Sequence, residues 1–101
     1  MLLSELVKRI EWNTEKSQIL VETRKLDFKI FAEIITNERE KIVAVINHPN
    51  IERYPTQRIF LINVDNYIYL VPFVEDEEKI FLKTVIPSNK YTRDYLINKK
   101  K

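Results

Sequence analysis

The sequence contains no glycine and no cysteine, and each absence excludes a class of site. Without glycine, neither a phosphate-binding P-loop nor a dinucleotide-binding fingerprint is present, because both need glycine where the backbone approaches phosphate. Without cysteine there is no disulfide, no thiolate zinc site and no cysteine nucleophile, and we expect a reducing, cytoplasmic location. A single histidine cannot form a histidine-rich metal site within one subunit. We therefore expect no metal and no cofactor.

Long apolar runs are also missing. None approaches the roughly 20 residues that a membrane-spanning helix requires, and the N-terminal segment lacks the apolar core and small-residue cleavage site of a signal peptide. We expect no membrane contact. What is present, 45% apolar and 32% charged residues in 101 positions, is the composition of one soluble globular domain spanning residues 1–101.

The C-terminal end of the sequence is basic. From Ser88 onward there are five basic residues and one acidic residue, a net charge of +4, and because the whole chain carries +2 the first 87 residues sum to −2. A basic end attracts a polyanion, and Lys90, Tyr91 and Arg93 are our candidates for contacts to RNA there. A solvated lysine tail explains the charge equally well.

Hydrophobic periodicity and capping residues predict an α+β fold. Asn13 and Asp27 are typical N-caps of two successive helices, and Ser88 is typical of a short C-terminal helix. The predicted strands are 42–46, 58–64, 67–74 and 80–86, and the segment 9–12 is compatible with a further strand. We expect two N-terminal helices packed on one face of a four-stranded, mainly antiparallel sheet, followed by the short C-terminal helix.

Asp65-Asn66 is a two-residue hairpin signal, and it fixes which side chains share a face of the sheet. With Val64 opposite Tyr67, one face, which we call the Arg58 face, includes Arg58, Phe60, Ile62, Tyr67, Tyr69, Val71 and Phe73. The other, which we call the Ile59 face, includes Ile59, Leu61, Ile68 and Leu70. Because the Ile59 face carries no charge, we expect it to pack against the helices.

The register of the last strand depends on the loop before it. If this loop spans five residues, 75–79, then Phe81, Lys83 and Val85 join the Arg58 face, and the even-numbered residues from Ile80 to Ile86 join the Ile59 face. This choice keeps Lys83 out of the core, where an unpaired ammonium group is costly. A four-residue loop reverses the faces. We interpret the acidic run 75–78 as a solvated hairpin tip, not a metal cluster.

The predicted Arg58 face combines cations with tyrosines. Arg58 and Lys83 can stabilise negative charge on a phosphate and Tyr69 can stack on a base, which suits binding and cleavage of single-stranded RNA. Two solvated cations at strand ends are the alternative interpretation. His48 is the candidate general acid or base, because imidazole titrates near neutral pH. A capping or packing role in its proline-containing loop is the alternative.

Three short motifs stand in order along the chain: Ile10–Lys16 (IEWNTEK), Leu26–Phe28 (LDF) and Ile86–Thr92 (IPSNKYT), with Tyr95 after the last. They resemble the Phe-Glu-Trp-Asp-x-x-Lys opening, the Gly-Val-Ser-Phe segment and the closing Ile-Ser-Ala-Arg-Arg-Ala-Thr of the BrnT family of type II toxins, which also has a trailing tyrosine. Their order and spacing cover nearly the whole chain and are more specific than any single motif.

The resemblance implies a RelE-like toxin fold, a ribonuclease activity that halts translation, and a cognate antitoxin of ribbon-helix-helix type. It assigns contacts with RNA to Arg58 on the first long strand, Lys83 on the last, and Lys90 at the motif's second arginine. Asn89 stands where the motif has its first arginine. Lys83 stands about where an arginine is expected, and lysine lacks the bidentate fork of arginine.

We therefore expect the toxin of a type II toxin–antitoxin system, a ribonuclease that cleaves RNA without a metal. In this mechanism Arg58 and Lys83 hold the phosphate, and His48 or a tyrosine assists attack by the RNA's own 2′-hydroxyl. The alternatives are a catalytically inactive RelE-like module that binds an antitoxin or RNA, and a structural domain that self-associates through its aromatic sheet face.

Overall fold

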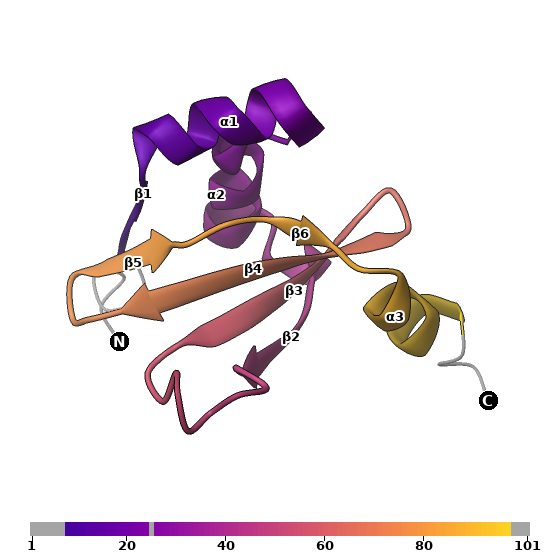
Figure 1. Cartoon of the computed structure of the whole chain (residues 1–101). Coiled ribbons are helices and arrows are strands. Elements are labelled where there is room, and N and C mark those ends of the chain that lie inside the picture. The colour runs from indigo at the N-terminus through magenta and orange to yellow at the C-terminus, as the bar shows by residue number, and fades with distance from the viewer. Residues whose placement is uncertain (1–7, 25, 98–101) are drawn as a thin grey trace.

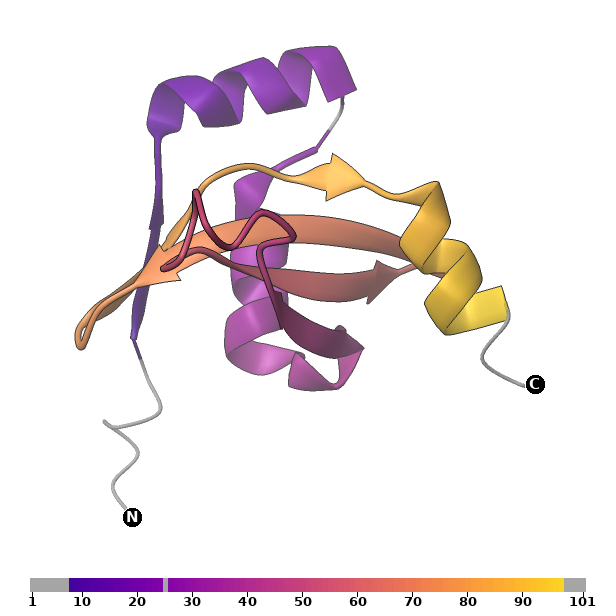
Figure 2. The same cartoon turned by 60° about the horizontal axis from the view of Figure 1, so that its bottom comes forward.

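The computed structural model describes residues 8–24 and 26–97 (Figure 1, Figure 2). The elements, in chain order, are β1 (Arg9–Trp12), α1 (Thr14–Arg24), α2 (Phe28–Asn37), the 3-10 turn η2 (Arg39–Lys41), β2 (Ile42–Asn47), β3 (Arg58–Val64), β4 (Tyr67–Glu75), β5 (Lys79–Leu82), β6 (Ile86–Pro87), α3 (Asn89–Thr92) and the π-helical turn η3 (Arg93–Ile97). Within the two described ranges, no helix has the length and apolar character needed to cross a membrane.

The strands form one mixed sheet in the order β1-β5-β4-β3-β2, and β6 pairs with β4. Strand β1 is parallel to β5, and the other pairings are antiparallel. The α+β class is therefore confirmed, whereas the expected four-stranded sheet is wrong in detail. The segment 9–12 is an edge strand, and the predicted strand 80–86 divides into β5 and β6.

The local signals for helix starts and for the hairpin are confirmed. The side-chain oxygens of the three capping residues each accept a hydrogen bond from a backbone N–H group of the first turn, at 2.9 to 3.1 Å: Asn13, Asp27 and Ser88. At the tip of the β3–β4 hairpin, Asp65 and Asn66 have φ values of 54° and 64°, which these residue types tolerate. Val64 pairs with Tyr67 and Arg58 with Phe73, as predicted.

Helix α2 covers the Arg58 face, so the expected packing on the Ile59 face is wrong. Buried side chains of α2 form one cluster with residues of that face: Phe28, Phe31, Ile34 and Ile35 with Phe60, Ile62, Val71, Phe73, Ile80, Leu82 and Val85. In Figure 1, α2 lies behind the sheet. Arg58 does not prevent this packing because it is the first residue of β3, so its charge lies at the end of the face and outside the buried cluster.

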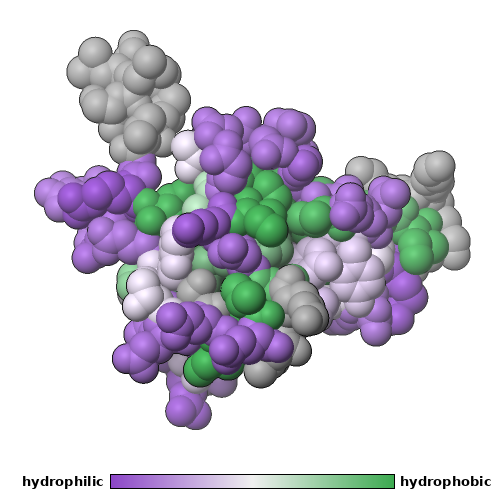
Figure 3. All heavy atoms as spheres, turned by 90° about the horizontal axis from the view of Figure 1, so that it is seen from above, coloured by the Kyte–Doolittle hydropathy of each residue, from purple (hydrophilic) through white to green (hydrophobic). Residues whose placement is uncertain are grey.

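Helix α1 contributes less to the core than we expected. Its Ile19 and Val21 side chains are 56% and 44% exposed, and no described α1 residue belongs to either core cluster. It lies above the sheet in Figure 1, and Figure 3, which looks down on that side, shows apolar patches between hydrophilic ones. Among the described residues of the two N-terminal helices, those of α2 therefore form the close packing on the sheet.

The C-terminal helical segment packs on the Ile59 face. Tyr91, Tyr95 and Leu96 lie against the cluster of buried Ile59, Leu61 and Ile68. Thr92, which is 8% exposed, fixes this segment to β4: its Oγ1 accepts from the N–H of Ile68 at 2.8 Å and donates to the carbonyl of Ser88 at 2.6 Å. The sheet thus has α2 on one face and α3–η3 at one end of the other.

Candidate nucleic-acid interface

Arg58 and Lys83 lie on opposite faces of the sheet, so the predicted pair of phosphate-holding cations is not assembled. Glu75 pairs with Ile80, which leaves four connecting residues, 76–79, in place of the expected five. The N–H group of Lys83 donates to the carbonyl of Pro72 at 2.8 Å, which continues the same register by one pair. Lys83 and Phe81 therefore project from the Ile59 face.

The short turn between β4 and β5 has a visible cause. Asp76 Oδ1 accepts hydrogen bonds from the N–H groups of Glu78, at 2.8 Å, and Lys79, at 2.9 Å. These two bonds lower the pKa of Asp76 and close a turn of the kind that aspartate favours. Lys83 still stays out of the core, because the Ile59 face is open at this strand.

Arg58 is held by a carboxylate on its own face. Its Nη2 forms an ion pair with Glu75 Oε1, while Lys8 Nζ lies 2.9 Å from Glu75 Oε2. The hydrogen bond from Lys8, followed by that from Arg58, lowers the pKa of Glu75 below its ordinary value. The Arg58 guanidinium also lies 5.5 Å from the Phe73 ring centroid. The guanidinium of Arg58, which we expected to bind a phosphate, is therefore paired with Glu75.

Tyr69 and His48 also have packing partners. The centroid of the Tyr69 ring lies 5.5 Å from that of Phe31 on α2, so Tyr69 packs against the buried cluster beneath this helix. The prediction that Tyr69 lies on an open surface is therefore wrong. The His48 ring lies 4.4 Å from Tyr54, and its Nδ1 accepts from the N–H of Asn50 at 3.0 Å. That bond occupies the lone pair of Nδ1, and in neutral imidazole Nε2 then carries the proton. This geometry fits the packing role of His48 better than a general base.

The remaining predicted residues lie after β5 and on the α3–η3 segment, which both border the Ile59 face. Lys83 Nζ lies 5.7 Å from the centroid of the Phe81 ring, and Lys90 Nζ lies 5.6 Å from that of Tyr91. Arg93 follows on η3 and is exposed. In the described part of the chain, none of these three cations forms an ion pair with a carboxylate. Each can therefore contact a phosphate without first breaking an ion pair with a described carboxylate.

Asn89, which stands where the BrnT motif has arginine, has a structural role. Its Oδ1 accepts a hydrogen bond from the Tyr67 hydroxyl at the end of the β3–β4 hairpin. This contact joins the start of α3 to β4 together with the Thr92 bonds. An arginine here would replace that acceptor by a donor, so this position contributes to the fold and adds no cation to the surface.

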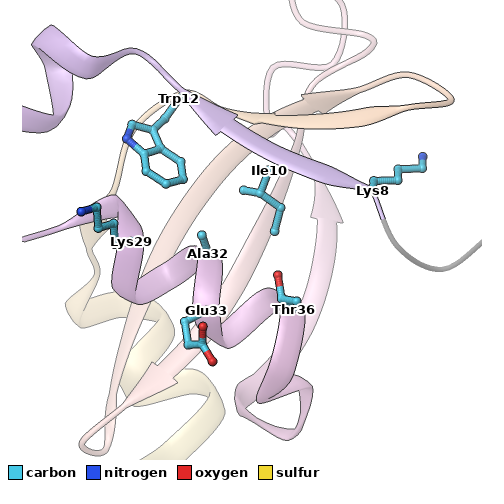
Figure 4. A pocket seen from close by; sticks show the side chains of 7 residues that line it. All are labelled: Lys8, Ile10, Trp12, Lys29, Ala32, Glu33 and Thr36. Atoms are coloured by element: carbon cyan, nitrogen blue, oxygen red, sulfur yellow. The ribbon is translucent and has the colours of Figure 1, made fainter. Parts of the chain in front are cut away.

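A hollow of about 410 Å³ between β1 and α2 lies on the other side of the molecule (Figure 4). In Figure 4, Trp12 and Ile10 point from β1 toward Ala32 of α2, and Lys8 points away. Lys8 is already paired with Glu75. Lys29, Glu33 and Thr36 complete the lining, and the Glu33 carboxylate together with the engaged Lys8 makes this hollow a poorer site for an anion than the Ile59-face side.

Phe81 belongs to the Ile59-face surface, although the sequence pattern indicated no binding role for it. Phe81 shares a face with Lys83 in any extended segment, because side chains two positions apart point the same way. That signal was present, but the pair was assigned to the wrong face because its loop length was assigned incorrectly.

No family model, curated protein or solved structure matches this chain. The resemblance to BrnT toxins therefore depends on the three short motifs, and the function must be argued from the geometry.

Proposed function

We propose that this chain is the toxin of a type II toxin–antitoxin pair and that it acts on single-stranded RNA through the Ile59-face side. The observation that carries the proposal is the arrangement of Lys83 and Lys90, each beside an aromatic ring and each without a carboxylate partner among the described residues. Cations that follow the backbone and rings on which bases stack are the two elements of single-strand binding.

The cationic set in this proposal differs from the one expected from the sequence. Lys83, Lys90 and Arg93 contact phosphates, and Tyr91 offers a ring for stacking. Arg58 has no part, since Glu75 holds it on the other face. In a metal-free cleavage these cations offset the charge that develops on the phosphate during attack by the 2′-hydroxyl.

A binding assay tests the proposal. We expect the triple variant Lys83→Ala, Lys90→Ala, Arg93→Ala to bind a fluorescent single-stranded RNA at least about tenfold more weakly than the native chain at low salt. Its plot of log affinity against log salt should be shallower by about 2, because each phosphate contact to a single strand contributes about 0.7 to the slope. Anisotropy titrations at several salt concentrations measure both.

The control removes the same number of charges from the side of α2. Lys29 and Lys41 line one hollow with residues of α2, and Arg39 Nε donates a hydrogen bond to the carbonyl of Ile35 on the same helix. The variant with alanine at these three positions should bind RNA as the native chain does. An equal loss of RNA affinity in both triple variants would show that binding depends only on net charge and would refute the proposed surface.

The second candidate is a catalytically inactive RelE-like module that binds RNA or an antitoxin. The separation of Arg58 from Lys83 and the hydrogen-bonded Nδ1 of His48 favour it, since neither the expected cation pair nor the expected base is in position. RNA digestion in the presence of EDTA, and growth on expression without a ribbon-helix-helix antitoxin, distinguish the two. Cleavage with growth arrest supports the toxin, and binding without either supports the module.

A further inference from the structure

A second hollow, of about 550 Å³, lies between the start of α1 and β5. Its lining comes from two segments far apart in the sequence: Asn13, Glu15, Lys16 and Ile19, with Phe81 and Lys83. This volume is within the range of small-molecule sites, about 300–1,000 Å³. Because Phe81 and Lys83 project from the Ile59 face, the hollow adjoins the surface proposed above to bind RNA.

The two lysines of this hollow have no carboxylate partner in the described part of the chain, unlike their neighbours. On β5, Lys79 Nζ lies 3.7 Å from Glu11 Oε1, and in β1 the Arg9 guanidinium lies 3.5 Å from the same carboxylate. Lys16 and Lys83 are both exposed. Two unpaired ammonium groups lining one hollow favour an anionic ligand.

The rest of the lining suits a planar heterocycle. Phe81 offers a half-buried ring beside the Lys83 ammonium. Asn13 Oδ1 is occupied by the N–H of Lys16 at 3.0 Å, which leaves the amide Nδ2 of Asn13 as a donor. The Glu15 carboxylate is acceptor-only and repels phosphate. One donor and one acceptor match the edge of a nucleobase, which presents both kinds of group.

We propose that this hollow binds a single nucleotide of the RNA strand. The base stacks on Phe81 with its edge toward Asn13 and Glu15, and the phosphate lies between Lys16 and Lys83. The repulsion by Glu15 orients the nucleotide, because it favours phosphate at the lysine side. The inference rests on the proposed function for the class of its ligand, but its geometry depends on α1 and β5 and not on α3.

Titration with 5′-AMP, followed by amide NMR shifts of the full chain, tests the hollow. We expect saturable shifts at residues 13–16 and 81–83. Phe81→Leu, which keeps an apolar side chain but removes the ring, should weaken 5′-AMP binding at least about fivefold, as stacking on an aromatic ring contributes about 1–3 kcal/mol per base. Lys16→Gln with Lys83→Gln should weaken it similarly, whereas Lys79→Gln should leave it unchanged.

Three outcomes overturn the inference. They are no shift at these amides with 5′-AMP, inorganic phosphate alone binding as tightly as 5′-AMP, and an equal loss in Lys79→Gln. Spectra of each variant without ligand should match the native spectrum away from the substituted residue, which excludes unfolding as the cause of a loss.

The failure of this inference differs from the failure of the proposed function. If long RNA binds in a manner that depends on Lys90 and Arg93, while Phe81→Leu binds it as the native chain does, the function stands and the hollow is not a nucleotide site. If 5′-AMP binds in a manner that depends on Phe81 while long RNA does not bind, the hollow stands and the function fails.

Discussion

At the scale of single residues, Glu75 decides which cations are available to a ligand. Its two carboxylate oxygens hold Lys8 and Arg58, one from the segment before β1 and one from the start of β3. Lys8 lies 67 positions before Glu75, so no local pattern indicates this contact. The same carboxylate removes Arg58 from the candidate phosphate ligands and fixes the end of the sheet.

The depressed pKa of Glu75 predicts a stability that depends on pH. The folded-state pKa lies below the unfolded value of about 4.3, so the contribution is complete above that pH and is lost as the pH falls through the folded pKa. We expect Glu75→Gln to lower the free energy of unfolding at pH 7 by up to about 1 kcal/mol, since the pair is partly solvated. The deficit should shrink below about pH 4.

Urea unfolding at pH 7 and pH 3 measures this difference. Glu77→Gln is the matched control, because Glu77 is exposed in the same acidic run and forms no ion pair with a described residue. A deficit that is constant with pH would show that the Gln substitution acts through packing and not through charge.

At the scale of elements, the register of β5 determines the chemistry of both faces. Leu82 is fully buried beneath α2, whereas Phe81 is half-buried on the opposite face and belongs to neither core cluster. We expect Leu82→Ala to lower the free energy of unfolding by about 2–5 kcal/mol, because it leaves a cavity in the core. Phe81→Ala should cost less than about half as much. Chemical denaturation measures the free energy of unfolding of the two variants. A larger loss in Phe81→Ala than in Leu82→Ala would contradict this register and support the five-residue loop.

The elements also show how far the sequence alone predicts this fold. The caps Asn13, Asp27 and Ser88 and the turn Asp65-Asn66 act through bonds within a few residues, and all were predicted correctly. The face of the sheet that α2 covers was predicted incorrectly, because it depends on contacts between distant segments. The prediction gave more weight to the charge of Arg58 at the end of β3 than to the aromatic side chains in the middle of the same face. The β5 register failed at a turn whose length depends on two hydrogen bonds to Asp76. Because Lys83 and Phe81 lie on this strand segment, the error in register also placed them on the wrong face of the sheet.

At the scale of the whole molecule, Trp12 lies where the sheet contacts helix α2, so its fluorescence is sensitive to the packing between them. Its ring stacks on Phe28 of α2 at 5.8 Å, and its strand pairs with β5. We expect tryptophan fluorescence and far-UV circular dichroism to give the same urea midpoint, because β1 contacts both the sheet and the helix that covers it. An earlier fluorescence transition would mean that β1 and α1 detach as a separate unit.

The parallel pairing of β1 with β5 has a consequence for biosynthesis. Arg9 pairs with Lys79 and Trp12 with Leu82, so β1 finds its neighbour only after about seventy further residues have been added. Contacts between such distant positions form late, because the entropy cost of closing a long loop must be met before the contacts can stabilise the chain. While the ribosome is still extending the chain, the backbone N–H and C=O groups of β1 therefore have no neighbouring strand until β5 has been synthesised.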